Sequence, residues 1–377
     1  MGKQIKRVII SGGGTGGHIF PAVSIANALM RLEPQMEILF VGAKGKMEMD
    51  KVPAAGYKIV GLDIQGINRQ SIVKNLLLPL KLWRSIRKAK QIIRDFKPDA
   101  VVGVGGFASG PLLHAAGSLG IPYLIQEQNS YAGITNKKLS KKAAKICVAF
   151  DGMEKFFPAE KIMNTGNPIR RDAVDITGKE FEAKELLGLD HTKKTVLLTG
   201  GSLGARTLNN CMLDGLKRLG AHDMQVIWQC GSYYYEQLLV AVRERQLDHD
   251  LCLKPFLHRM DLAYAAADVI IARAGAGTIA ELCAVGKPVI LVPSPNVAED
   301  HQTKNAQALT AKHAAVMIRD ADAEKQLIDA LIELIADKPR CKTLGTQIKQ
   351  LAKLTADEVI AKEVLKLEGT KTESARA

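Results

Sequence analysis

Two glycine-rich segments of this sequence have the composition that phosphate-binding loops require. The first, residues 8–18, reads VIISGGGTGGH, and the second, residues 196–206, reads VLLTGGSLGAR. In each, a short apolar strand runs into glycines that let the backbone approach a ligand. The helix that follows directs free N–H groups and a positive dipole end toward that ligand, which favours an anion. One such segment is weak evidence, but two predict a pair of nucleotide-type domains that face a common cleft.

His18 ends the first glycine segment, where the sequence predicts the mouth of that cleft. An imidazole accepts protons near neutral pH, so His18 is a candidate general base. The ordinary alternative is a histidine that caps a helix or packs in the core. Its position at the end of a glycine loop favours the catalytic interpretation.

The spacing G-x-G-x-x-G over residues 12–17 also matches the dinucleotide-binding fingerprint, which keeps an NAD-dependent oxidoreductase open. That fingerprint requires an acidic residue at the end of the second strand. Here the predicted strand ends in VGAK at residues 41–44, without a carboxylate. The missing acid counts against a dehydrogenase.

Acidic residues in the second half suggest either nucleotide contacts or turn chemistry. In residues 271–281, IARAGAGTIAE, a small-residue turn opens a helix, and Glu281 follows about one helical turn later. Its carboxylate is placed to accept hydrogen bonds from two ribose hydroxyls, or simply to complement the helix dipole.

The D-x-D triplets at 248–250 and 320–322 are interpreted as structural, since the first precedes a strand and Asp322 is placed to cap a helix. No metal site is predicted.

The net charge of +13 calls for a polyanionic partner. Basic residues are concentrated in Arg69–Lys97, where Asp95 is the only acid and leucines, isoleucines and Trp83 are interleaved. This composition favours docking on an anionic membrane surface, although a half-buried helix with a basic outer side explains it too. Nucleic acid is not expected as a partner, because no reading helix or aromatic RNA-binding motif is present.

No apolar run reaches the ~20 residues of a membrane span, and six scattered cysteines indicate a reducing compartment.

The elements that must position these residues alternate between strand and helix in both halves, which predicts an α/β fold with parallel sheets. In the first half we expect strands at 8–10, 38–41, 58–62, 100–104, 123–126 and 145–149, and helices at 21–31, 47–55, 72–96 (broken at Pro79) and 111–119. In the second half we expect strands at 195–198, 226–229, 251–255, 269–272 and 289–292, followed by helices. The predicted division is 1–170, 171–345 and 346–377, the last including a frayed polar tail.

The order of motifs from residue 8 to about 310 resembles the MurG family of peptidoglycan N-acetylglucosaminyltransferases. The motifs are GGTGGHIFP at 13–21, GGFASGP at 105–111, EQN at 127–129, GNPIR at 166–170, GGSLGA at 200–205 and the turn at 273–281. The resemblance implies the GT-B architecture, in which two Rossmann-like parallel-sheet domains face a central cleft and a C-terminal helix returns to the first domain. It also implies inverting transfer of N-acetylglucosamine from UDP-N-acetylglucosamine (UDP-GlcNAc) to the 4-hydroxyl of N-acetylmuramyl-pentapeptide-pyrophosphoryl-undecaprenol, without a cofactor or bound metal.

The same resemblance assigns roles to individual residues. Two would be catalytic, His18 as the base and Glu127. Those expected near the sugar and acceptor are Thr15, Gly16, Gly17 and Asn129, and those expected near the diphosphate are Arg170 and Ser202. The nucleotide contacts would be the backbone of Leu257 for uracil, the turn Ala276, Gly277, Thr278 and Ile279, and Glu281 for the ribose. Gln302 would meet the donor-sugar hydroxyls.

Two residues depart from the family pattern, and several alternatives stay open. Gln126 stands where the family commonly has histidine, and His301 where it often has glutamine. The resemblance places the protein at the cytoplasmic face of the inner membrane, with cell-wall synthesis proteins as possible partners. Alternatives on the same fold are a glycolipid glycosyltransferase, a UDP-GlcNAc 2-epimerase and a non-catalytic UDP-sugar sensor.

Overall fold

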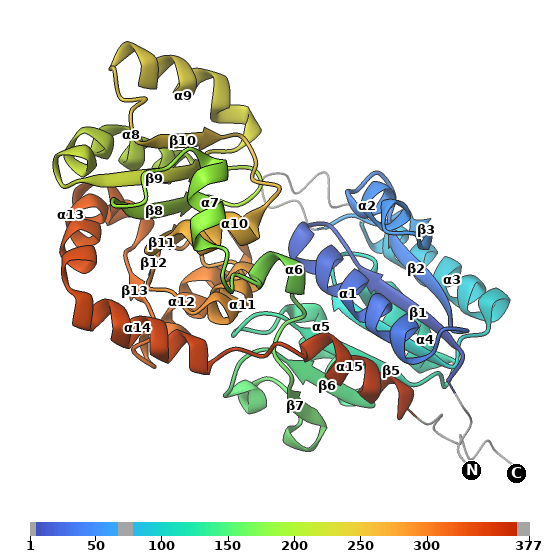
Figure 1. Ribbon diagram of the computed structural model, residues 1–377. Helices are drawn as coiled ribbons and strands as arrows, with labels where there is room; N and C mark the ends of the chain where they lie inside the picture. The colour runs from blue at the N-terminus through green and yellow to red at the C-terminus, as the bar shows by residue number, and fades with distance from the viewer. Residues whose placement is uncertain (1–4, 67–77, 368–377) are drawn as a thin grey trace, which may run out of the picture. The chain divides into compact units, whose positions relative to one another are not determined.

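The computed structural model describes residues 5–66 and 78–367 and divides the chain into two compact units. The first unit comprises residues 1–169 together with 355–377, and the second comprises residues 170–354. Each unit is built on one parallel sheet with helices on its faces (Figure 1).

The strands of the first sheet are β1 (Arg7–Gly12), β2 (Glu37–Ala43), β3 (Lys58–Leu62), β4 (Ala100–Gly105), β5 (Tyr123–Glu127), β6 (Lys145–Val148) and β7 (Ile162–Asn164). Those of the second are β8 (Lys194–Thr199), β9 (Met224–Gln229), β10 (Leu251–Lys254), β11 (Val269–Ala272), β12 (Val289–Leu291) and β13 (Val316–Met317).

The helices of the first unit are α1 (Gly16–Leu32), α2 (Glu48–Ala54), α3 (Leu78–Phe96), α4 (Ser109–Ser118), α5 (Ile134–Leu139) and α15 (Ala356–Leu365). Those of the second are α6 (Arg171–Val174), α7 (Glu180–Leu187), α8 (Arg206–Ala221), α9 (Ser232–Glu244), α10 (Met260–Ala266), α11 (Ala276–Val285), α12 (His301–Thr310), α13 (Ala323–Ala336) and α14 (Lys338–Gln350).

The first sheet has the order β3-β2-β1-β4-β5-β6-β7, and every neighbouring pair is parallel. Successive strand residues face opposite sides of a sheet. Ile9 accordingly packs in the core with α3 and α4, while Val8 and Ile10 pack in the core with α1 and α15. Burial of both faces explains why these strands are nearly continuous apolar runs.

The second sheet repeats the arrangement with the order β10-β9-β8-β11-β12-β13, again with every neighbouring pair parallel. One of its faces packs against α8, α9 and α13 in a core that contains Trp228 and Leu327, both fully buried. In both sheets the strand order reverses at one place, between β1 and β4 and between β8 and β11. Such switch points are where open α/β sheets bind ligands.

Several expectations from the sequence need correction. Helix α1 begins at Gly16, ahead of the expected start at Pro21, so His18 lies in its first turn. The described part of α3 begins at Leu78, so the expected break at Pro79 falls at the edge of the described residues and stays a prediction. Residues 72–77 of the expected helix lie outside the described residues. The short strands β7 and β13 were not predicted, since three and two residues leave no pattern to detect.

The second unit extends further than predicted, to residue 354, because α14 packs against α11 and α13. The helix that returns to the first unit is α15. Arg31 on α1 forms a 2.7 Å ion pair with Asp357, and Ile360 and Val364 are fully buried in the core that α1 also lines. The expected polar tail, 369–377, falls outside the described residues.

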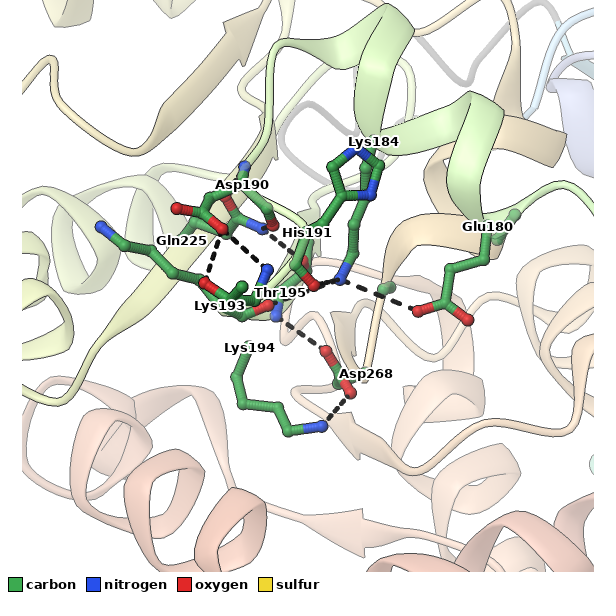
Figure 2. Close-up of polar contacts among 12 residues, drawn as sticks. Glu180, Lys184, Asp190, His191, Lys193, Lys194, Thr195, Gln225 and Asp268 are labelled. Atoms are coloured by element: carbon green, nitrogen blue, oxygen red, sulfur yellow. Dashed lines mark hydrogen bonds and ion pairs between the residues drawn. The ribbon is translucent and has the colours of Figure 1, made fainter.

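The polar stretch after residue 170 contains α6 and α7 and is held to the second sheet by a buried lysine (Figure 2). Only 5% of the Lys184 side chain is exposed. Its ammonium donates to the carbonyls of His191 (3.2 Å) and Lys193 (3.5 Å) and lies 3.7 Å from the Glu180 carboxylate. These hydrogen bonds connect α7 to the turn that precedes β8. Among the described residues no helix combines the length and apolar character needed to cross a membrane.

Candidate active site

In the first unit, Thr15, Gly16, Gly17 and His18 follow β1 at the switch point between β1 and β4, while Glu127 and Asn129 lie at the end of β5, the next strand of the sheet. The loop after β1 touches the loop after β4 directly, with Gly13 N–H donating to the Gly105 carbonyl at 3.3 Å. The register of β1 against β4 shifts between Ser11 and Gly12, a bulge at the edge where a ligand would sit. Glycine loops predicted from composition alone therefore occur where the topology places a binding site.

His18 is half-buried in the first turn of α1, and its ring packs against the end of β4. Its Nδ1 lies 3.3 Å from Thr15 Oγ1. A Cβ on Gly105 would fall 2.5 Å from the Cδ2 and 2.8 Å from the Nε2 of this ring, so only glycine leaves room for it. Gly105 also has a φ of +108°, which side chains rarely adopt. Backbone shape at β4 thus fixes where the imidazole lies.

Thr15, Gly16 and Gly17 surround the N-terminus of α1. Thr15 is the N-cap residue and is exposed, and Gly16 and Gly17 form the first helical positions. The absence of side chains at both glycines leaves the first-turn N–H groups approachable, with the positive end of the helix dipole behind them. This arrangement suits an anionic or hydroxyl-rich ligand.

Glu48 is a site residue that the sequence analysis missed. It is 1% exposed, and its carboxylate accepts the N–H groups of Gly14 (2.8 Å) and Ala43 (2.9 Å). The acid absent from the end of β2 is thus supplied by the start of α2, and it binds the glycine loop itself. A dinucleotide pyrophosphate at this loop would be repelled by the buried Glu48 carboxylate. This is further evidence against a dehydrogenase.

Glu127, at the end of β5, is 2% exposed, and its carboxylate accepts hydrogen bonds from the loop that follows and from α5. Its oxygens accept from the N–H (3.1 Å) and side-chain amide (3.4 Å) of Asn129, the N–H of Gly133 (3.2 Å) and the Asn136 side chain (2.8 Å). Burial raises the pKa of Glu127, although the hydrogen bonds oppose that shift. The carboxylate therefore shapes the loop that presents Asn129.

The second unit gathers predicted nucleotide contacts at its own switch point, between β8 and β11. Ser202 is exposed in the loop after β8, and Gly275 caps α11 after β11. Ala276, Gly277 and Thr278 form the first turn of α11, while Ile279 is buried and its N–H donates to the Gly275 carbonyl at 2.9 Å. Loop amides and a helix N-terminus converge here, as an anion site requires.

Glu281 and Arg170 lie side by side in the second unit, as the resemblance implied for residues of one nucleotide site. Arg170 Nε is 3.9 Å from Glu281 Oε1, and the buried Tyr264 hydroxyl donates to Glu281 Oε2 at 3.1 Å. Burial raises the pKa of Glu281, while the Arg170 charge and the tyrosine hydrogen bond lower it. Tyr264 is a second residue missed by the sequence analysis.

Leu257 and Gln302 lie elsewhere in the second unit, the first in a loop and the second in a helix. Leu257 is buried after β10, and its N–H donates to Gln229 Oε1 at 2.8 Å. Gln302 is in the first turn of α12, and its Oε1 accepts from Ser294 N–H at 2.9 Å. Glu299 and Asp300 just before it both have positive φ, 55° and 51°, a strained entry to this helix.

The D-x-D triplets act structurally. Asp320 pairs with Arg273 and accepts from the Thr207 hydroxyl at 3.0 Å, and Asp250 accepts from Lys193 at 2.6 Å. Asp322 occupies the N-cap position of α13, but its side chain bonds Arg319 and leaves the helix N–H groups alone, contrary to the predicted cap. No group of three metal-ligating acidic, histidine or cysteine side chains occurs within residues 5–66 and 78–367.

Comparisons with known proteins agree with this geometry. Residues 8–148 match the glycosyltransferase family 28 N-terminal domain, and residues 195–363 match the C-terminal domain of the same family. A relative from Parabacteroides distasonis, named UDP-N-acetylglucosamine–N-acetylmuramyl-(pentapeptide) pyrophosphoryl-undecaprenol N-acetylglucosamine transferase, is 56% identical over 96% of this chain and 98% of its own. A Porphyromonas gingivalis protein of the same name is 51% identical over 96% of this chain and 95% of its own.

The solved structures give the same result. The crystal structure of Acinetobacter baumannii MurG is 29% identical, with a TM-score of 0.78 over 96% of this chain and 100% of that one. A UDP-N-acetylglucosamine 2-epimerase, 16% identical with a TM-score of 0.64 over 96% of each chain, shares the fold alone. The resemblance drawn from the sequence and the GT-B fold it implied are confirmed.

Proposed function

Because this chain belongs to glycosyltransferase family 28, we propose that it transfers N-acetylglucosamine from UDP-GlcNAc to the lipid-linked N-acetylmuramyl-pentapeptide acceptor. The relatives named for this reaction align with nearly the whole chain. One structural observation carries the proposal: each unit has a glycine-rich loop and a helix N-terminus at the switch point of its sheet. Two such sites fit a reaction between a nucleotide sugar and a pyrophosphoryl lipid.

The donor site lies in the second unit. The N–H groups of the loop after β8 and of the first turn of α11 bind the diphosphate, with Ser202 and Arg170 beside it. The Glu281 carboxylate accepts the ribose hydroxyls, and Gln302 contacts the sugar. The leaving UDP gains negative charge as the bond breaks, and N–H groups already aimed at it stabilise that charge.

The acceptor site lies in the first unit, around Thr15, Gly16, Gly17, His18 and Asn129. The acceptor 4-hydroxyl oxygen forms a bond to the anomeric carbon as the carbon–oxygen bond to UDP breaks, which inverts that centre. His18 accepts the hydroxyl proton. Glu127 acts as a positioning residue in this scheme, since its oxygens already bind Asn129 and its loop.

The proposal includes peripheral docking on an anionic membrane at the cytoplasmic side, where a polyprenyl acceptor would be reached. Helix α3 supports it. Ser85, Ala89, Ile92 and Ile93 face the core, while Leu80, Leu82 and Trp83 are 44%, 43% and 57% exposed. Basic residues flank this apolar end along the same helix, namely Lys81, Arg84, Arg87, Lys88, Lys90 and Arg94.

A paired assay with radiolabelled UDP-GlcNAc, with and without a lipid acceptor analogue, tests the reaction. We expect label in the lipid product only when the acceptor is present. Donor consumption without acceptor would instead identify an epimerase or hydrolase. Tight UDP binding with no turnover would leave a UDP-sugar sensor.

His18→Ala tests the proposed base. We expect kcat to fall by about 10²–10⁴-fold, the usual contribution of general base catalysis, with little change in UDP affinity. His114→Ala is the matched control, because His114 is an exposed histidine on α4 of the same unit. Near-normal turnover by His18→Ala would assign the base elsewhere.

A further inference from the structure

The Glu48 side chain is enclosed between the first glycine loop and the end of β2. A Cβ on Gly13 would overlap the Glu48 carboxylate, and the three atoms nearest to that Cβ all belong to this carboxylate. A Cβ on Gly42 would fall 2.6 Å from Glu48 Cγ. Two glycines thus leave room for one acidic side chain, whose oxygens accept from the N–H groups of Gly14 and Ala43. Because Glu48 is only 1% exposed, it acts on the loop from beneath.

The loop that Glu48 binds leads directly to His18. Gly14, whose N–H the carboxylate accepts, has a φ of +84°, and the next residue, Thr15, is the N-cap of α1. Thr15 Oγ1 lies 3.3 Å from His18 Nδ1. The position of Gly14 therefore determines where the threonine hydroxyl meets the imidazole.

Gly13 connects the same loop to the other side of the imidazole. Its N–H donates to the Gly105 carbonyl at 3.3 Å, and a Cβ on Gly106 would overlap the Gly13 backbone. Gly105 is the residue whose missing side chain leaves room for the His18 ring. Both sides of the imidazole are therefore in contact with backbone whose position depends on Glu48.

We propose that Glu48 is a positioning residue for the base of the transfer reaction. A carboxylate offers an acceptor on each oxygen, whereas an amide would turn a donor toward one of the two N–H groups. A reacting group displaced by about 1 Å can lose about a hundredfold in rate, so a loop shift of that size would be detectable. The inference rests on the role given to His18 under Proposed function.

Asp99 supplies a control at the opposite end of the same two strands. It directly precedes β4, and its Oδ2 accepts from Lys6 N–H (2.9 Å) and Arg7 N–H (3.0 Å) at the start of β1. Asp99 thus also satisfies two backbone N–H groups of the first unit, but at the end of the sheet away from the glycine loops. A loss of activity caused by lower stability alone would appear in variants of both residues.

The test measures transfer to the lipid acceptor analogue, UDP affinity by calorimetry, and thermal unfolding of full-length variants. For Glu48→Met we expect kcat to fall about ten- to a hundredfold. UDP affinity should stay within about twofold of wild type, because the proposed UDP site lies in the second unit. Glu48→Gln keeps one acceptor and should regain part of the lost rate. Asp99→Ala should lower thermal stability and leave kcat within about twofold of wild type.

Histidine-selective NMR gives a readout that does not depend on turnover. The His18 imidazole signals are identified by their absence from the His18→Ala spectrum. They should shift or broaden in Glu48→Met and stay unchanged in Asp99→Ala. Unchanged His18 signals or an unchanged kcat in Glu48→Met would overturn the role of Glu48. A wild-type chain that transfers no sugar would instead overturn the proposed reaction, and the NMR comparison would still decide whether Glu48 positions the imidazole.

Gly13→Ala covers the case in which Glu48→Met does not fold. The φ of Gly13 is not positive, so alanine fits the backbone, and its Cβ would push the Glu48 carboxylate away from the loop. We expect a lower kcat and altered His18 signals in this variant too, with UDP affinity retained. If Gly13→Ala has wild-type kcat and wild-type His18 signals, Glu48 does not position the base.

Discussion

Three carboxylates near the two candidate sites, Glu48, Glu127 and Glu281, have different contacts, and those contacts distinguish their roles. Glu48 accepts hydrogen bonds from the N–H groups of Gly14 and Ala43, so it shapes the first glycine loop. Glu127 accepts hydrogen bonds from Asn129, Gly133 and Asn136, so it shapes the loop that follows β5. Glu281 has only a tyrosine hydroxyl at 3.1 Å and an arginine at 3.9 Å within the second unit. Its acceptor capacity suits a ligand with hydroxyl groups, such as a ribose.

The raised pKa of Glu281 gives donor binding a predictable pH dependence. The carboxylate accepts ribose hydroxyls and the protonated form accepts them poorly, so the KM for UDP-GlcNAc should rise as pH falls toward this raised pKa. Glu281→Gln should raise that KM about tenfold and abolish its acid dependence. Steady-state kinetics across pH, with a saturating acceptor analogue, measures both.

Tyr264→Phe provides a second test of whether the acid dependence of KM comes from Glu281. Its hydroxyl lowers the pKa of Glu281, so removing it should move the acid rise in KM to higher pH while kcat changes little. A KM profile identical in wild type and both variants would show that Glu281 does not bind the donor.

At the scale of elements, most strands and helices could be predicted from the sequence, because both faces of each sheet are buried and the strands are apolar runs between glycine turns. The glycine segments at 13–17 and 200–204 were predicted where the structure has them, directly after β1 and β8, the first of them running into α1. Glu48 and Tyr264 were not, since their partners Gly14 and Glu281 lie far away in sequence. No local pattern encodes such pairs.

The contacts of Lys184 on α7 lead to a prediction about stability. Lys184→Met keeps the apolar stem but leaves the carbonyls of His191 and Lys193 without their donor, so the free energy of unfolding should fall by about 1–3 kcal/mol. Glu180→Gln is the control: its side chain is 70% exposed, and surface ion pairs contribute about 0–1 kcal/mol. Denaturant unfolding of both variants measures the difference. Equal, small losses would mean that solvent replaces the ammonium.

For the whole molecule, the excess of 52 basic over 39 acidic residues fits the proposed substrates and the proposed membrane surface, because all of these are anionic. UDP-GlcNAc and a pyrophosphoryl lipid each carry phosphate charge, and a membrane that holds the lipid adds more. Helix α3 combines both features that membrane docking needs, with exposed Leu80, Leu82 and Trp83 at its start and basic residues along it. Two further leucines of the basic stretch Arg69–Lys97, Leu76 and Leu77, lie outside the described residues.

Membrane docking by α3 can be tested separately from catalysis. Burying a large apolar side chain is worth about 1.5–3 kcal/mol, so the pair Leu80→Ser and Trp83→Ser should lower binding to phosphatidylglycerol vesicles at least about tenfold in co-sedimentation. Leu186→Ser is the control, because that leucine is 63% exposed on α7 in the second unit. High salt should weaken the wild-type interaction by screening the basic residues. The double variant should still transfer sugar to a water-soluble acceptor, since neither residue is part of the proposed sites. Undiminished vesicle binding by that variant would mean that another surface docks on the membrane.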